Sequence, residues 1–303
     1  MTSEPTKKNC TEKISEKHFY NVLYLSKRKG MDIIMGSLLN RLLIMLNDSD
    51  PKSTDYHITF TLLMNFYLLS TLSIGEVAKL CTVSKSTISK FIRNIGYEDY
   101  ADFKSAAPFK ENKFGFDLNY NQNIAEYIES NGLEHYINIL YNDLISAKSS
   151  IDMSKIEALA KDLLAYQKVI SFGLLFSEIG AIDLQWKLAY NGKFIITNMS
   201  DIKQKDLLDR ATEDTLIIIY SNSGSYIQKY QLSEFQEPKD FSHLKAKLVL
   251  ITSNKKMTNY PGIDLCICYG HTSSVQTHSI LYPLINDMIV MKYREFIRKK
   301  KQE

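Results

Sequence analysis

Short apolar runs rich in β-branched residues recur through the second half of the chain, and segments of helical periodicity separate them. The runs cover residues 169–173, 194–197, 215–220, 247–252 and 263–268. Parallel strands that are buried on both faces form continuous apolar runs of this kind, with helices between them along the chain. The pattern therefore predicts an α/β domain in which helices cover both faces of a parallel sheet. Ligands of such sheets bind in loops beyond the carboxyl ends of the strands.

The part of the chain before residue 151 differs, because its apolar residues recur at helical spacing. The length of 303 residues is typical of two domains. Near residues 107–123 the periodicity weakens, and Pro108, Gly115 and several asparagines occur. We expect an all-α helical domain over 1–106, a linker with connecting helices over 107–150, and the α/β domain over 151–303. The expected helices are 19–46 with a break at Gly30, 55–70, 74–81, 85–95, 154–166, 178–190, 201–210 and 276–298.

The composition limits the classes of partner and site. A net charge of +3 is too small to indicate a nucleic acid partner by itself, so a local basic cluster is needed for one. Four cysteines without zinc spacing and six scattered histidines predict no metal site, and we expect no cofactor. The polar first residues and the short apolar stretch 58–72 predict no signal peptide and no membrane partner. We expect a cytoplasmic protein with reduced thiols and with Trp186 in its core.

Residues 73–96 have the periodicity of two short helices joined by a tight turn. Ser73 and Glu76 form the S-x-x-E pattern of a capping box, and Ser84 is a typical N-cap for the second helix. Each helix has apolar residues at i, i+3, i+4 and i+7, which predicts one buried face. Gly96 is a typical C-terminal stop. The buried positions are Ile74, Val77, Ala78 and Cys81 in the first helix, and Ile88, Phe91, Ile92 and Ile95 in the second.

The second helix has hydroxyl and basic side chains opposite its apolar face. No acidic residue occurs between Val77 and Tyr97. A recognition helix requires such a face, because its N-terminal residues reach base edges while hydroxyl and basic groups contact phosphates. The sequence therefore predicts binding to double-stranded DNA, and the alternative is a helical hairpin with a solvated basic face. The candidate DNA-binding residues are Lys85, Ser86, Thr87, Ser89, Lys90 and Arg93.

This stretch resembles the N-terminal domain of the RpiR family of bacterial transcription regulators. The resemblance implies a helix-turn-helix that binds an operator, followed by a SIS (sugar isomerase) domain with a flavodoxin-like α/β/α fold. Lys90 departs from the family pattern, since many members have arginine there, with a planar group suited to bidentate contacts. The matching residues are Ile74, Glu76, Val77, Ala78, Val83, Ser84, Ser86, Thr87, Ile88, Lys90, Phe91, Arg93, Ile95, Gly96, Tyr97, Tyr100, Phe103 and Lys104.

Two loops that follow predicted strands resemble the ligand loops of SIS domains. Hydroxyls and backbone N–H groups at such strand-to-helix junctions are suited to phosphate. The alternative is that these loops only cap helices and hold no ligand. The candidate ligand-binding residues are Gly173 and Ser177 in the first loop, and Ser221, Ser223, Gly224 and Ser225 in the second.

Two residues depart from the SIS pattern in these loops. Leu175 occupies the position of a second glycine, and Tyr226 occupies that of a threonine that binds phosphate in many members. Both changes predict a smaller and less polar pocket than is usual in the family.

The resulting hypothesis is a transcription regulator of carbohydrate-metabolism genes whose SIS domain binds a phosphosugar effector. One helix-turn-helix reads only a few base pairs, so we expect a homodimer or homotetramer on paired half-sites. We expect a regulator and not an enzyme. One alternative is a sugar-phosphate isomerase, for which Glu178 is the best candidate base. Another is a regulator whose SIS domain only dimerises.

Overall fold

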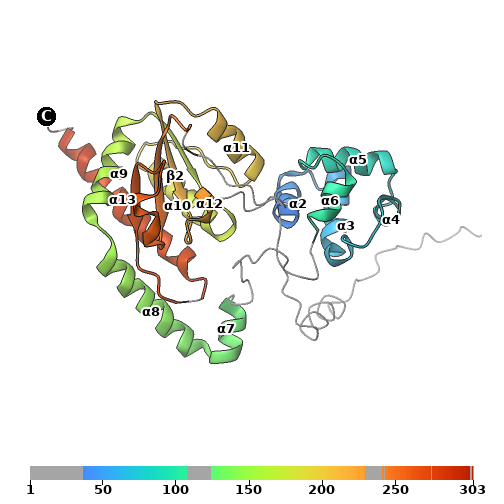
Figure 1. Ribbon diagram of the computed structural model, residues 1–303, viewed down its shortest axis with the longest axis horizontal. Helices are drawn as coiled ribbons and strands as arrows, with labels where there is room; N and C mark the ends of the chain where they lie inside the picture. Colours follow the sequence, from blue (N-terminus) through green and yellow to red (C-terminus); the bar gives the residue numbers. More distant parts are fainter. Residues whose placement is uncertain are drawn as a thin grey trace, which may run out of the picture.

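The computed structural model describes residues 37–107, 124–228, 241, 243–273, 275–300 and 302. In Figure 1 the helices α2 to α6 gather in one unit, and the sheet with its covering helices forms another. The expected helix 19–46 lies largely outside the described residues, as does the expected break at Gly30. The boundaries expected for the domains, at residues 106 and 150, remain predictions.

The helical unit has a compact apolar core of its own. Its elements are α2 (Ser37–Asp48), α3 (Thr54–Met64), the 3-10 helix η1 (Phe66–Leu68), α4 (Ile74–Leu80), α5 (Lys85–Asn94) and α6 (Tyr100–Ser105). The expected helices 74–81 and 85–95 are thus confirmed as α4 and α5. The core residues include Leu38, Leu42, Ile58, Leu62, Val77, Ile88, Phe91, Ile92 and Phe103, all almost completely buried.

The expected continuous helix over 55–70 is wrong, because α3 ends at Met64 and η1 follows. Asn65 lies at the break, and its side-chain Nδ2 donates to the carbonyl of Thr61 at 2.8 Å. An asparagine side chain that bonds to nearby backbone groups favours caps and turns over helix interiors. Periodicity alone does not reveal such a break.

The α/β unit contains a four-stranded parallel sheet in the order β1-β2-β3-β4. The strands are β1 (Lys168–Phe172), β2 (Thr215–Tyr220), β3 (Lys247–Thr252) and β4 (Leu265–Cys268). The expected strand over 194–197 is reduced to one bridge beside β1, where the N–H of Ser171 donates to the carbonyl of Ile196 at 2.8 Å. The parallel sheet predicted from the apolar runs is therefore confirmed.

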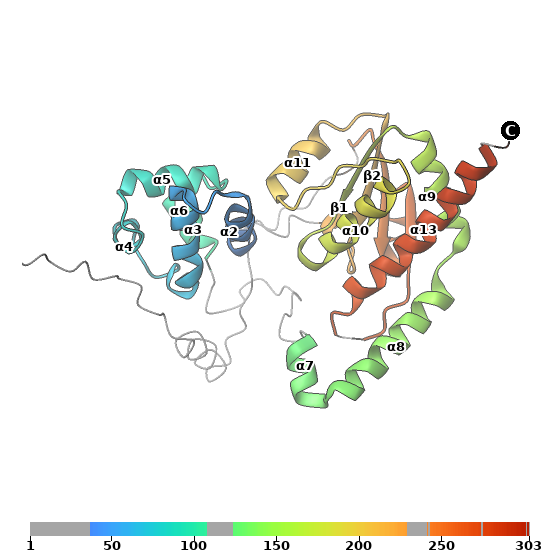
Figure 2. The ribbon, with the colours of Figure 1, turned by 180° about the vertical axis from the view of Figure 1, so that it is seen from behind.

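Helices cover both faces of the sheet (Figures 1 and 2). One face packs against α9 (Met153–Ala165), α10 (Glu178–Ala189) and α13 (His278–Lys300). The other packs against α11 (Asp201–Asp209), α12 (Ser225–Gln228) and the 3-10 helix η4 (Lys255–Asn259). Two further helices, α7 (Ile124–Asn131) and α8 (Leu133–Ser150), precede the sheet. The last turns of α8 join its core through the buried Ala147.

Trp186 is 62% exposed, so its expected place in the core is wrong. Helix α10 turns Ala181, Leu184 and Leu188 toward the sheet, at i, i+3 and i+7. Trp186 follows Leu184 by two residues and therefore lies on the opposite side of the helix. There it contacts Tyr190, which is even more exposed.

Candidate nucleic-acid interface and ligand site

The turn between α4 and α5 is fixed by caps on both helices. Ser73 and Glu76 form the expected capping box, with the Ser73 N–H donating to Glu76 Oε2 at 2.7 Å. Ser84 caps α5 by accepting from the Thr87 N–H at 3.1 Å. Thr82 lies between the two caps with a left-handed φ of 55°, which reverses the chain direction in a short turn. The geometry confirms the predicted helix-turn-helix.

The hydroxyl and basic face of α5 points away from the core of the helical unit. Lys85, Ser86, Lys90 and Arg93 are exposed, and Ser89 is half-buried. In the described part of the chain, the salt bridges include none of the three cations on this face. Their charges are therefore available for an external anion.

A cluster of hydroxyls marks the N-terminal end of α5. The Oγ atom of Ser84 lies 2.7 Å from that of Ser86 and 2.8 Å from the Oγ1 atom of Thr87. Lys85 extends past Gly75 of α4, where a Cβ atom added to the glycine would lie 3.1 Å from Lys85 Cε. The cluster therefore combines donors, acceptors and one cation at the helix end that a recognition helix inserts first.

The loop after β1 closes tightly on the start of α10. A Cβ atom on Gly173 would lie 2.4 Å from the carbonyl of Ser177, so only glycine fits here. Leu175 has a left-handed φ of 55°, a conformation that glycine adopts without strain and that costs another residue about 1 kcal/mol. A glycine at this position would avoid that strain. Ser177 is buried, and its hydroxyl lies 3.2 Å from that of Tyr282.

The loop after β2 begins α12 with hydroxyl groups. The buried Ser221 accepts the Tyr226 N–H at 3.2 Å, whereas the exposed Ser223 lies 2.6 Å from the Ser225 hydroxyl. Gly224 has a left-handed φ of 77° and lies against Met257. Each hydroxyl thus has a partner within the protein. The expected convergence of Ser177, Ser221 and Ser223 around one ligand remains a prediction.

Tyr226 extends into the core beneath the loops. Its side chain is 3% exposed, and its hydroxyl donates to Gln204 Oε1 of α11 at 2.9 Å. Gln204 in turn donates to the carbonyl of Gly173 at 2.8 Å. Through Gln204 of α11, Tyr226 therefore links the start of α12 to the loop after β1.

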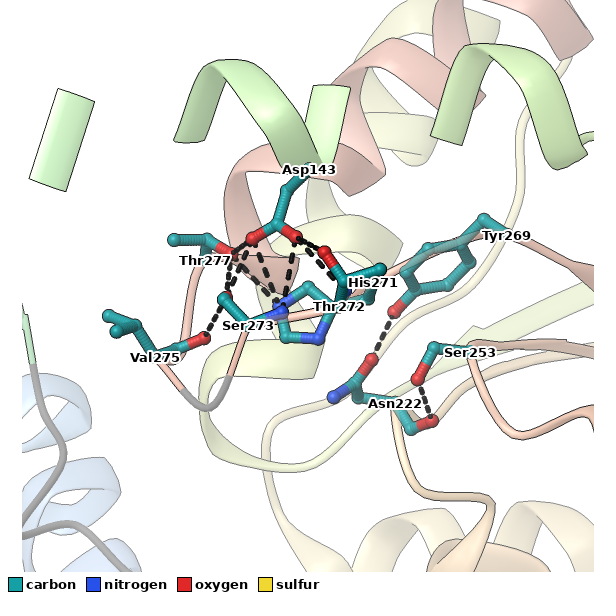
Figure 3. A network of polar contacts seen from close by, with 9 residues as sticks. All are labelled: Asp143, Asn222, Ser253, Tyr269, His271, Thr272, Ser273, Val275 and Thr277. Carbon is teal, nitrogen blue, oxygen red and sulfur yellow. Dashed lines mark hydrogen bonds and ion pairs between the residues drawn. The ribbon is translucent and has the colours of Figure 1, made fainter. Parts of the chain in front are cut away.

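Two polar groups at the strand ends were missed by the sequence analysis (Figure 3). Asn222 follows β2, and its Oδ1 accepts from the hydroxyl of Tyr269, after β4, at 2.7 Å. Ser253, after β3, donates its hydroxyl to the carbonyl of Asn222 at 2.9 Å. These contacts join three successive strand ends. Asn222 lies within the serine loop, so its position in the sequence could have identified it.

A buried carboxylate of α8 holds the segment before α13. Asp143 is fully buried and accepts hydrogen bonds from the hydroxyls of Thr272, Ser273 and Thr277 at 2.6–3.1 Å (Figure 3). These bonds lower the pKa of Asp143 although burial raises it. The Nε2 atom of His271 lies 3.8 Å from Oδ2 of the same carboxylate. No sequence signal could have identified Asp143, because it lies in the segment predicted to be a linker.

Glu178 is a buried carboxyl group at the junction of the first loop and α10. Its Oε2 accepts the Gly173 N–H at 3.1 Å and the Gln204 amide at 3.2 Å, while its Oε1 accepts the Thr197 hydroxyl at 2.6 Å. Burial raises the pKa of Glu178 to about 8, although these hydrogen bonds lower it. Both oxygens contact the protein, so this carboxyl acts as a structural link between three segments.

The described residues contain no group of three or more His, Cys, Asp or Glu side chains that could hold a metal ion. None of the described helices is long and apolar enough to cross a membrane.

We predict that Glu178→Gln flattens the pH dependence of stability. The folded-state pKa of Glu178 lies above the unfolded value, so its stabilising contribution is complete below pH 4.5 and is lost as the pH rises through 8. The free energy of unfolding of the wild type should therefore fall by about 3 kcal/mol between pH 5 and pH 8 through this group. Urea denaturation at several pH values measures this difference between the two proteins. The exposed Glu213→Gln is the control, and an equal slope for Glu178→Gln and the wild type would contradict the assignment.

Residues 39–108 match the model of the helix-turn-helix domain of the rpiR family. A Providencia stuartii protein described as an uncharacterized HTH-type transcriptional regulator in the aarA 3' region is 22% identical over 196 residues, 63% of this chain and 67% of its own length. The Vibrio vulnificus NanR protein complexed with ManNAc-6P is 16% identical, with a TM-score of 0.45 over 88% of this chain and 94% of its own. The sugar isomerase domain of the Sphaerobacter thermophilus RpiR transcription factor is 14% identical, with a TM-score of 0.39 over 55% of this chain and 98% of its own. Residues 39–108 of this chain are therefore similar to the helix-turn-helix domain of the rpiR family.

Proposed function

We propose that this chain is a transcription regulator that binds operator DNA through α5. The observation that carries the proposal is the hydroxyl and basic face of a capped helix whose other face is buried, with three cations that take part in none of the described salt bridges. A short helix held by its partner helix at a tight turn can enter the major groove. We assign base contacts to Lys85, Ser86 and Thr87 at the N-terminal end, and phosphate contacts to Ser89, Lys90 and Arg93.

We propose further that the α/β unit is a SIS domain that binds a phosphosugar effector and so controls carbohydrate-metabolism genes. The support is chemical: hydroxyl-bearing loops follow the adjacent parallel strands β1 and β2, and each loop leads into a helix. Such junctions favour anions, because hydroxyls and free N–H groups meet there. We assign the binding to Gly173 and Ser177 in the first loop and to Ser221, Ser223, Gly224 and Ser225 in the second.

The contacts of Glu178 favour a sensor over a sugar-phosphate isomerase. A general base must reach a substrate proton, whereas both oxygens of this carboxyl contact Gly173, Gln204 and Thr197. We therefore propose a regulator that acts in the cytoplasm without catalysing a reaction.

We propose that the regulator binds DNA as a homodimer or homotetramer. Exposed apolar side chains gather on and just after α10, and large apolar patches are typical of protein–protein contacts. They include Ile179, Trp186, Tyr190, Phe194 and Ile196. This surface also supports the second candidate, a regulator whose SIS domain only dimerises.

We predict that replacing Lys85, Lys90 and Arg93 together by Ala weakens operator binding at least 100-fold without unfolding the protein. Each lost phosphate or base contact costs about 1–3 kcal/mol, and all three side chains are exposed. Fluorescence anisotropy with an operator selected from random duplex DNA measures the affinity. The matched control replaces the exposed Lys148, Lys161 and Lys255, which removes the same charge from the α/β unit. Equal affinities for the two triple variants would refute the interface.

We predict that Ser223→Ala weakens phosphosugar binding about 5- to 150-fold, since a hydrogen bond to a charged group is lost. A thermal-shift screen of sugar phosphates that includes ManNAc-6P identifies the ligand, because a compound that binds the folded state raises the Tm. Titration calorimetry then compares the wild type, Ser223→Ala and the control Ser149→Ala, an exposed serine of α8. If none of the sugar phosphates raises the Tm of the wild type, the result would favour the alternative in which the SIS domain dimerises and binds no ligand.

A further inference from the structure

Arg41 of α2 makes contacts with both units of the molecule. Its Nη2 lies 2.9 Å from Asp201 Oδ2, and its Nε donates to Asp201 Oδ1 at 3.4 Å. Its Nη1 donates to the carbonyl of Gly96, just beyond α5, at 3.0 Å. The guanidinium also lies over the ring of Tyr97, 4.5 Å from its centroid. One side chain therefore joins the end of the DNA-reading helix to the first turn of α11.

Further contacts surround this ion pair. The Asn40 side chain donates to the carbonyl of Met199 at 3.4 Å. Ile202 packs closely on Gly96, since a Cβ atom added to Gly96 would lie 2.1 Å from the Cδ1 atom of Ile202. The side chains of Arg41 and Asp201 are only 14% and 19% exposed. A two-point contact that is largely shielded from water depends strongly on geometry, unlike an exposed ion pair.

The same helix, α11, also holds both candidate ligand loops. Gln204 lies one turn after Asp201 and is 1% exposed. It donates to the carbonyl of Gly173 in the first loop and accepts from Tyr226, which follows the second loop. A movement of either loop therefore acts on α11 at Gln204, and a movement of α11 acts on Arg41 at Asp201.

We propose that the Arg41–Asp201 contact is the connection through which the state of the ligand loops sets the position of α5. A role for this contact in regulation rests on the proposed DNA and ligand binding. The contact between α2 and α11 itself does not depend on either ligand. In the intact contact, Asp201 orients Arg41, and Arg41 holds the backbone at Gly96. Loss of the carboxylate charge leaves the helical unit free to reorient relative to α11.

Hydrogen–deuterium exchange of the full chain tests the link without ligand or DNA. We predict that Asp201→Asn increases exchange of the amides of residues 95–97 at least threefold. Tyr226→Phe, which removes only the hydroxyl bonded to Gln204, should increase exchange at the same amides, and adding it to Asp201→Asn should cause no further increase. The control Asp206→Asn removes an exposed ion pair with Arg210 on the same helix and should change nothing at 95–97.

The outcomes separate the link from the proposed function. Unchanged exchange at 95–97 in Asp201→Asn would overturn the role of the ion pair. Additive effects of Asp201→Asn and Tyr226→Phe would overturn the connection between the loops and α5. The affinity for operator DNA is measured separately. We expect Asp201→Asn to raise the Kd for the operator about fivefold, because α5 loses its fixed orientation. A wild type that binds no DNA would refute the proposed function but leave the exchange results to decide the link.

Discussion

The buried carboxyl of Glu178 is the interaction on which the arrangement of the α/β unit depends. It joins the loop after β1, the segment beside β1 and helix α11, through Gly173, Thr197 and Gln204. An ionised carboxylate is costly to bury, so burial raises the pKa of Glu178 to about 8 and favours the protonated form near neutral pH. In the neutral carboxyl, Oε2 still accepts the N–H groups of Gly173 and Gln204, and the O–H at Oε1 can donate to the Thr197 hydroxyl. The loops after β1 and β2 thus rest on a buried polar network that includes Glu178 and Gln204.

The parallel sheet could be predicted because its strands are buried on both faces and therefore form unbroken apolar runs. The features that the sequence did not predict are set by local contacts of single residues. At Asn65 a side chain bonds to the preceding turn and ends α3, and hydrophobic periodicity does not record this. At Ile196 the chain forms a single bridge beside β1, although its composition suits a full strand. The expectation that Trp186 lies in the core is wrong, because its position in the helical repeat of α10 puts it on the solvent side.

The candidate sites were predictable to the extent that their residues are close in sequence. The face of α5 follows from helical spacing, and the serine loops follow from their places after strands. Gln204 and Asp201 carry no such signal, since their partners lie far away in the chain. Arg41 and Asp201 are 160 positions apart, and only the fold brings them together. Leu175 and Tyr226 stand out in the sequence, but their consequences do not. The structure shows a strained backbone at Leu175 and a buried hydrogen bond from Tyr226 to Gln204 of α11.

The salt dependence of operator affinity tests most directly the claim that α5 lies against DNA phosphates. The logarithm of the binding constant falls linearly with the logarithm of the salt concentration, by about 0.9 for each phosphate contact. We expect Arg93→Ala to reduce this slope by about one and to weaken operator and unrelated DNA equally, whereas the control Arg210→Ala should leave the slope at the wild-type value. A slope that is unchanged by Arg93→Ala would contradict the account.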